Sequence, residues 1–234
     1  MNNVLIVVQA RANSKRLPNK IWADLHGKPM LQHVLERARH IGPEVFVATP
    51  PPGLDENDVL GRFKLVSEYY PDVEHFVRLT ADCPLLDVGV AKRILEEHLR
   101  GGWDFTGTSY NLDGLDVECF TCGLLEMADV HDHDDREHVT KWMRMGAKHS
   151  LITSFGGWKL DWSVDDARDL LWARRVMKDC QWCYAGVPHH TNARGSIGGN
   201  DGRWPVWDLH DLGQAGLTEC TAHDTRMERA EWRP

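Results

Sequence analysis

The feature that most constrains this chain is a short apolar run followed at once by a loop of positive charge. Residues 4–8 are aliphatic and mostly β-branched, which is typical of a buried parallel strand. The loop after them carries no acid and four cations, which are Arg11, Lys15, Arg16 and Lys20. An open α/β sheet binds its ligand at the carboxyl ends of its strands. Cations placed there favour a bound polyphosphate over a solvated surface loop, which would normally mix both signs of charge.

Composition excludes several classes of protein. The formal net charge of −8 over 234 residues argues against a general nucleic-acid binder, which would show a basic face. No apolar run approaches the length of a membrane span, and the first apolar run precedes the cations, the reverse of a signal peptide. We therefore expect a cytoplasmic protein without nucleic-acid or membrane partners, whose six cysteines are reduced.

Strand and helix patterns alternate along the chain and predict an α/β fold. Residues 29–41 carry one apolar stripe at helical spacing, and Gly42-Pro43 ends that helix. A second apolar run at residues 45–48 completes a βαβ unit, which implies a parallel sheet. The same patterns predict a central strand at residues 76–80, a helix at 88–100 and a short strand at 103–109.

Four short motifs follow one another at the start of the chain: Gln9-Ala10-Arg11, Ser14, Arg16-Leu17-Pro18-x-Lys20 and Gly27-Lys28-Pro29-Met30. Together they resemble the opening signature of sugar nucleotidyltransferases. The similarity is greatest to the cytidylyltransferases of spore-coat polysaccharide synthesis, which are relatives of the CMP-Kdo and CMP-sialate synthetases. The resemblance covers roughly residues 4–178. It implies that residues 1–178 form a Rossmann-like three-layer nucleotidyltransferase domain of the glycosyltransferase-A type, with a mostly parallel central sheet. Residues 179–234 form a tail of unknown role.

The resemblance implies that a sugar attacks the α-phosphorus of CTP and that pyrophosphate leaves. Arg11, Arg16 and Lys20 would be catalytic, because they would hold the phosphates and stabilise the developing charge. The nucleotide-binding residues would be Gln9, Ala10, Arg11, Ser14, Lys20, Thr80 and Asp82. The acceptor would be a sugar, which we expect to be acidic, for surface polysaccharide or glycoconjugate synthesis.

Two aspartates are candidate ligands for Mg²⁺. Asp82 follows the predicted central strand in the string RLTADCPLLD, which is similar to the family's metal-binding strand end. The family places its second metal-binding aspartate at the position of Asp165, within residues 163–166. The alternative for Asp82 is a turn-forming residue before Cys83-Pro84. Asp165 could belong to a capping box that opens a helix with apolar positions Leu170, Leu171 and Val176.

The acceptor side is expected around residues 114–118, GLDVE, which resemble the family's acceptor-sugar region. Asp116 and Glu118 are two residues apart and would share one face of a strand. They could bind sugar hydroxyls, assist proton removal, or line the solvent side of an edge strand. Arg136 and His138 match a family motif at the substrate pocket. The acceptor-binding candidates are Tyr110, Asn111, Asp116, Glu118, Arg136 and His138.

Two parts of the chain depart from the family. Relatives place a further helix and strand before the motif at residues 58–62, and here only residues 49–58 stand there. That segment helps to hold the base in relatives, so the identity of the base is open. In the tail, Cys180, Cys183, Cys220 and His223 have the paired spacing of a structural zinc site, although the gap between the pairs is long.

Two other functions stay open. A glycosyltransferase of the same fold that uses a nucleotide sugar would need a D-x-D metal motif near mid-chain, but Asp82 is followed by Cys83-Pro84. A non-catalytic nucleotide-binding relative is suggested by the shortened segment and the divergent tail. A homodimer is also possible, because relatives are commonly dimers.

Overall fold

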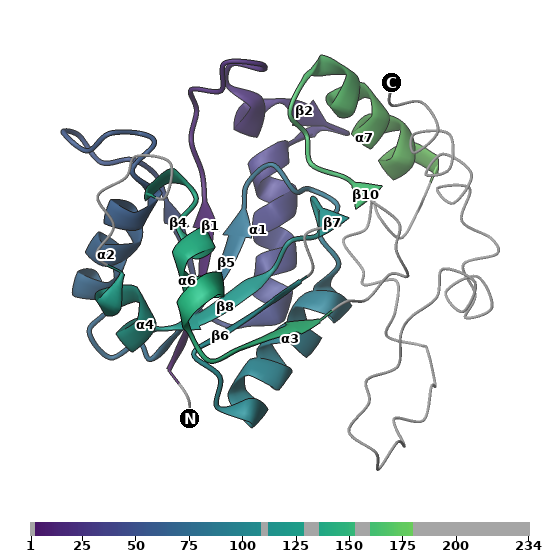
Figure 1. The fold of residues 1–234 in the computed structure, drawn as a ribbon. Helices are drawn as coiled ribbons and strands as arrows, with labels where there is room; N and C mark the ends of the chain where they lie inside the picture. The colour runs from purple at the N-terminus through teal and green to yellow at the C-terminus, as the bar shows by residue number, and fades with distance from the viewer. Residues whose placement is uncertain (1–2, 109–111, 129–135, 153–159, 180–234) are drawn as a thin grey trace, which may run out of the picture.

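One central sheet with helices on both faces is formed by the residues that the computed structural model describes, 3–108, 112–128, 136–152 and 160–179 (Figure 1). The sheet has six strands in the order β4-β1-β5-β8-β6-β9. Neighbouring strands are parallel, except that β8 is antiparallel to β5 and β6. The strands are β1 Val4–Gln9, β4 Val45–Ala48, β5 His75–Thr80, β6 Phe105–Thr108, β8 Glu118–Thr121 and β9 His149–Ile152. The expected mostly parallel, three-layer α/β fold is confirmed.

The first βαβ unit follows the prediction. β1 leads to α1, Met30–Ile41, and the chain returns through β4, parallel to β1. Pro29 precedes α1, where its missing N–H removes no helical hydrogen bond, and Gly42 ends the helix. Between β1 and α1 the structure adds a 3-10 turn, η1 (Lys20–Trp22), and a small hairpin of β2 (Asp24–Leu25) and β3 (Lys28–Pro29).

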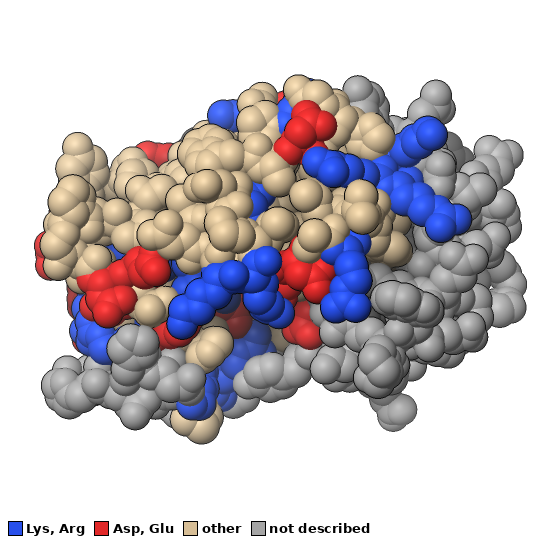
Figure 2. All heavy atoms as spheres, turned by 90° about the horizontal axis from the view of Figure 1, so that it is seen from above, with Lys and Arg blue, Asp and Glu red and all other residues tan. Residues whose placement is uncertain are grey.

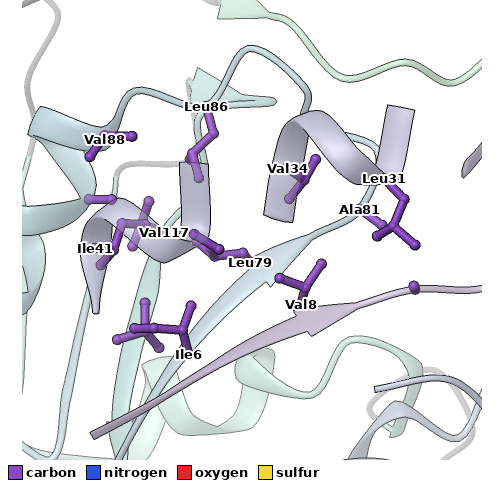
Figure 3. Packing of buried hydrophobic residues seen from close by; sticks show 14 of the residues in the cluster. Ile6, Val8, Leu31, Val34, Ile41, Leu79, Ala81, Leu86, Val88 and Val117 are labelled. Carbon is purple, nitrogen blue, oxygen red and sulfur yellow. The ribbon is translucent and has the colours of Figure 1, made fainter. Parts of the chain in front are cut away.

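Alternate residues of β1 point to opposite faces of the sheet. Ile6 and Val8 pack against α1 and against α3, Val88–Gly101, in the first core cluster (Figure 3). The carboxylate of Asp87 caps α3, because its Oδ1 accepts a hydrogen bond from Val90 N at 3.0 Å. The helix ends at Gly102, whose left-handed φ of 57° suits glycine. This face of the sheet is therefore sealed by two amphipathic helices.

The second core cluster covers the other face. Its helices are α2 (Val59–Tyr69), α4 (Cys122–Met127) and α6 (Thr140–Gly146) (Figure 1). Phe63 of α2 meets Phe76 and Phe120 edge-on, with ring centroids 6.4 Å and 5.5 Å apart. Aromatic rings prefer this edge-to-face arrangement. The rings fix α2 against the strands whose ends carry the candidate site.

A third core cluster lies under α7, Ala167–Asp179. Trp162 and Val164 enter it from the segment before the helix, and Leu25 and Met30 enter it from the region after η1. A short parallel pair, β7 (Leu112–Asp113) and β10 (Leu160–Asp161), precedes α7. The cluster therefore joins residues 160–179 to the region that follows β1.

Two expectations for α7 are wrong. Leu171 is 62% exposed, so the buried side of the helix contains Leu170 and Val176 but not Leu171. The capping box lies three residues later than expected. Asp166 Oδ1 accepts hydrogen bonds from the N–H groups of Arg168 and Asp169, and Asp169 Oδ2 accepts those of Asp165 and Asp166. Two carboxylates bind more helix-end N–H groups here than the Ser163 hydroxyl could.

Some expectations concern residues outside the described part. These are the acceptor candidates Tyr110 and Asn111, and the zinc motif within residues 180–234. Residues 49–58 are described and contain no helix or strand, which agrees with the shortened segment seen in the sequence. Among the helices that the structure describes, none is both long and apolar enough to cross a bilayer.

Candidate active site

β1 and β5 end side by side at one edge of the sheet. They pair in parallel with Gln9 opposite Thr80, and Ala81 N donates to Gln9 O at 2.9 Å. The cationic loop therefore leaves β1 next to the point where Asp82 leaves β5. Figure 2 looks down on this edge, where basic and acidic side chains lie next to one another. The structure thus brings the loop and Asp82 together.

Lys20 is the buried centre of this edge. Its side chain is 7% exposed, and its Nζ donates to Asp82 Oδ2 at 2.7 Å, to Val164 O at 3.0 Å and to Asp165 Oδ1 at 3.1 Å. An ammonium group has three protons, so all of them are used. Val164 N donates to Asp82 O at 2.8 Å, which fixes the segment before α7 against the end of β5. The two candidate metal ligands therefore meet at one lysine.

Charges around Lys20 stabilise one another. Burial opposes the charge of Asp82, yet the Lys20 ammonium and its hydrogen bond hold the pKa of that carboxyl below its ordinary value. Burial likewise opposes the charge of Lys20, whose pKa is nevertheless raised by the carboxylates of Asp82 and Asp165. Arg16, which is 68% exposed, places Nη2 2.9 Å from Asp165 Oδ2. Each oxygen of Asp165 thus contacts a cation.

Arg11 contacts a different set of residues. Its Nη1 donates to Asn57 Oδ1 at 2.7 Å and to Glu137 Oε1 at 3.0 Å. These partners come from the segments before α2 and before α6. The cations proposed to hold phosphate therefore form two groups: Arg16 and Lys20 beside the aspartates, and Arg11 beside Asn57 and Glu137.

Arg136 and His138 lie in the segment that leads into α6. Arg136 Nη2 is 2.7 Å from Asp58 Oδ2. The other oxygen of Asp58 caps α2 by accepting from Gly61 N at 2.8 Å. His138 is exposed, and its carbonyl accepts from Lys141 N at 2.8 Å. Arg136 therefore joins α2 to the segment before α6. The same segment contains Glu137, the partner of Arg11.

Glu118 is a buried carboxylate that holds two arginines. Its side chain is 4% exposed; Oε2 accepts from Arg78 Nη1 at 2.5 Å, and Oε1 accepts from Arg144 Nε at 3.1 Å. Thr140 Oγ1 donates to Oε1 at 2.8 Å. Burial would raise the pKa of Glu118, but the two guanidinium groups lower it below its ordinary value. Arg78 Nε also donates to Gln9 Oε1 at 3.0 Å, which ties Gln9 to Glu118.

Asp116 differs sharply from Glu118. It precedes β8 instead of sharing a strand face with Glu118, because β8 begins at Glu118. Within the part of the chain that the structure describes, Asp116 forms no hydrogen bond or ion pair. Burial and the nearby carboxylates of Glu118 and Asp113 raise its pKa to about 7, although Arg78 and Arg144 act in the opposite direction. Asp116 can therefore exchange a proton near neutral pH.

Arg62 lies buried beneath the cationic loop. Its Nη1 donates to Ala10 O and Ala48 O, each at 3.1 Å, and its Nη2 donates to Glu56 O at 3.2 Å. Burial, with the nearby positive charge of Arg11, lowers its pKa to about 10. Arg62 therefore fastens the ends of β1 and β4 to the shortened segment at residues 49–58.

The other nucleotide candidates have local partners. Ser14 Oγ accepts from Leu17 N at 3.3 Å, which braces the loop. Thr80 Oγ1 lies 2.8 Å from Cys83 Sγ. Ala10 is buried and offers its carbonyl to Arg62. These contacts hold the backbone of the loop and of the β5 end in place.

Sequence reasoning missed several residues of this network, among them Asn57, Arg78, Glu137 and Arg144. Arg78 gave a signal, because a charged residue inside an apolar strand needs a buried partner. For the other three, spacing along the chain gives no signal. They become visible only when the fold brings distant segments together.

The structure is a three-layer α/β fold in which a cationic loop meets two aspartates at the carboxyl edge of the sheet. A cytidylyltransferase family model matches residues 5–149, which is more than half of the chain, and the chain belongs to this family. The resemblance seen in the sequence is therefore confirmed.

Two relatives show how far the similarity reaches. An uncharacterized protein of Methanocaldococcus jannaschii is 30% identical over 162 residues, 60% of this chain and 66% of that protein. A 3-deoxy-manno-octulosonate cytidylyltransferase of Serratia proteamaculans is 35% identical over 111 residues, 39% of this chain and 45% of that enzyme. The chain thus spans less than half the length of the latter enzyme.

Solved structures share the fold. A cytidylyltransferase from Leptospira borgpetersenii superposes with a TM-score of 0.69 at 23% identity, covering 76% of this chain and 87% of that chain. A CMP:2-keto-3-deoxy-manno-octonic acid synthetase complexed with CTP superposes with a TM-score of 0.58 at 18% identity, covering 76% and 99%.

Proposed function

We propose that this chain transfers a cytidylyl group from CTP to a hydroxyl group of a sugar. The hydroxyl oxygen bonds to the α-phosphorus, the bond from that phosphorus to the bridging oxygen breaks, pyrophosphate leaves and the hydroxyl proton is released. The observation that carries the proposal is the contact of Lys20 with Asp82 and Asp165 beside Arg16, in a member of the cytidylyltransferase family. Such a reaction asks the protein mainly for alignment and charge neutralisation.

The loop cations would hold the triphosphate. Arg16 and Lys20 would meet it at the ends of β1 and β5, and Arg11 would meet it from the side of Asn57 and Glu137. Cations fixed before the reaction stabilise the charge that develops on the leaving pyrophosphate without reorganising. The rest of the nucleotide would contact Gln9, Ala10, Ser14 and Thr80.

Asp82 and Asp165 would hold Mg²⁺. Both bond to the same Lys20 nitrogen, so their carboxylates lie close enough to share a cation. Among the described residues there is no cluster of three or more His, Cys, Asp or Glu side chains suited to a metal. Two aspartates nevertheless fit Mg²⁺, which is usually bound by one or two carboxylates together with substrate phosphates and waters. Bound Mg²⁺ would neutralise charge on the triphosphate.

For the acceptor we propose an acidic sugar, used in surface polysaccharide or glycoconjugate synthesis. Support comes from the relatives named 3-deoxy-manno-octulosonate cytidylyltransferase. Asp116 would take up the hydroxyl proton, and Glu118 would act through Arg78 and Arg144, which it binds. Tyr110, Asn111, Arg136 and His138 would complete the acceptor side. A homodimer is proposed on the resemblance alone, and a cytoplasmic location on the pattern of the sequence.

The test measures pyrophosphate release from each of the four ribonucleoside triphosphates, with Mg²⁺ and a panel of acidic and neutral sugars. We expect release with CTP and an acidic sugar, and its loss in Asp82→Asn, which keeps the size of the side chain. Nucleotide binding without release in any combination would favour a transferase that uses a nucleotide sugar. Absence of both binding and release would favour a non-catalytic relative that has also lost Mg²⁺-dependent nucleotide binding.

A further inference from the structure

The hydrogen bonds of Lys20 affect how a divalent cation could bind at Asp82 and Asp165. Its three protons are all committed, two of them to Asp82 and Asp165, which would be the metal ligands. Arg16 occupies the other oxygen of Asp165. In the protein alone, a buried ammonium group therefore already neutralises the carboxylates that a divalent cation would need.

We propose that Lys20 keeps the divalent-cation site closed until a nucleoside triphosphate binds, so that metal and nucleotide enter as a coupled pair. This inference rests on the proposed function, because it assumes that Asp82 and Asp165 are the metal ligands. It assigns Lys20 a second role, as the residue that sets the order in which the ligands bind.

Charge balance explains why the metal would bind poorly by itself. Asp82 and Asp165 together carry two negative charges, and Lys20 and Arg16 carry two positive ones. A divalent cation that approaches this neutral set meets the Lys20 ammonium at close range, where repulsion in a partly buried site is strong. To bind both carboxylates it must also break two hydrogen bonds of a buried ammonium, which is costly.

A triphosphate would reverse this balance. Its oxygens offer Lys20 and Arg16 new anionic partners, and lysine can follow them because its charge sits on a flexible stem. The main chain need not move: Lys20 N donates to Leu17 O at 3.1 Å and Ala23 N donates to Lys20 O at 3.0 Å, which anchors η1. Once Lys20 turns to phosphate, the two carboxylates lose a counter-charge and gain affinity for the metal.

Coupling of this kind is reciprocal. If nucleotide raises the affinity for metal, metal must raise the affinity for nucleotide by the same factor. In a variant without the Lys20 charge, no ammonium group has to leave the two carboxylates before the metal binds. The variant Lys20→Met should therefore bind metal better without nucleotide and show a smaller coupling factor.

The experiment titrates the full chain with Mn²⁺ alone and then with Mn²⁺ and CTP, reading the paramagnetic resonance of the free ion. In the absence of CTP, we expect Lys20→Met to bind Mn²⁺ about tenfold tighter than the unmodified protein. Lys15→Met is the matched control, because Lys15 is an exposed lysine of the same loop. In the absence of CTP, Lys15→Met should bind Mn²⁺ with the same affinity as the unmodified protein. Adding Asp82→Asn to Lys20→Met should abolish the gain.

Equal or weaker Mn²⁺ binding by Lys20→Met without CTP would overturn the inference. So would tight Mn²⁺ binding by the unmodified protein without CTP, a measurement that needs no variant. Lys20→Gln, which keeps a polar side chain, takes the place of Lys20→Met if a thermal melt shows that the latter is unfolded. Titration of CTP in the presence of excess Mg²⁺ separates this inference from the proposed function. Absence of CTP binding under these conditions would overturn the proposed function, whereas CTP binding that leaves the Mn²⁺ affinity unchanged would overturn the inference alone.

Discussion

At the scale of single residues, the pairing of each acid decides its role. Glu118→Gln would keep the size of the side chain but leave Arg78 and Arg144 buried without their carboxylate. An uncompensated buried charge is strongly destabilising, so we expect the free energy of unfolding to fall by about 3 kcal/mol in urea denaturation. The control is Glu68→Gln, at an exposed position, which should leave stability unchanged. Equal stability of both variants would contradict the structural role of Glu118.

The raised pKa of Asp116 predicts that the stability of the protein depends on pH. That pKa, about 7 in the folded protein, exceeds its ordinary value of 3.8, so the folded protein keeps a proton that the unfolded chain releases. Stability therefore falls as the pH rises from about 4 to about 7 and is constant above that. Asp116→Asn should match the unmodified protein below pH 4 and exceed its stability above pH 7 by on the order of 4 kcal/mol.

Urea denaturation at a series of pH values measures the gap between Asp116→Asn and the unmodified protein. Asp113→Asn is the comparison, since Asp113 lies nearby and contributes to the raised pKa of Asp116. It should produce a smaller gap over the same range. A gap that does not change between pH 4 and pH 7 would show that the pKa of Asp116 is not raised.

At the scale of elements, the cap of α7 links stability to the site. Asp166→Ala removes a carboxylate that accepts from the N–H groups of Arg168 and Asp169, at the start of the helix that follows Asp165. Loss of such a cap costs about 1 kcal/mol in unfolding free energy, measurable by thermal melting. Asp166→Asn should retain most of the stability because asparagine caps as well as aspartate does. Equal loss in both variants would argue against capping.

The same elements show what sequence can predict. The sequence predicts β1, α1, β4, β5 and α3 closely because each has a clear apolar pattern, and proline or glycine also marks the ends of α1 and β4. In α7 the prediction is wrong at Leu171, which is exposed. A helix packed on one side buries only the residues of one narrow face, and two adjacent leucines do not show which of them lies on that face. The loop cations and Asp82 were expected at one edge of the sheet. The contacts of Arg11 with Asn57 and Glu137 depend on the fold and had no local signal.

At the scale of the whole molecule, the candidate site extends beyond the family match. That match ends at residue 149, yet Lys20 bonds to Val164 and Asp165. The third core cluster, which contains Trp162 and Val164, holds this segment against Leu25 and Met30. Residues 160–179 are therefore part of the domain that carries the site and not an appendage to it.

This conclusion predicts that Trp162→Ala affects both the fold and the site. Trp162 is buried, and its loss should lower the free energy of unfolding by about 3 kcal/mol because the cavity left under α7 cannot collapse fully. Trp22→Ala is the matched control: Trp22 is 59% exposed and should give a change near zero. In a protein still folded at low temperature, Trp162→Ala should also weaken CTP binding, since the backbone beside Asp165 is then held less firmly. Unchanged stability would mean that residues 160–179 do not pack on the sheet domain. In that case Asp165 would not belong to the site.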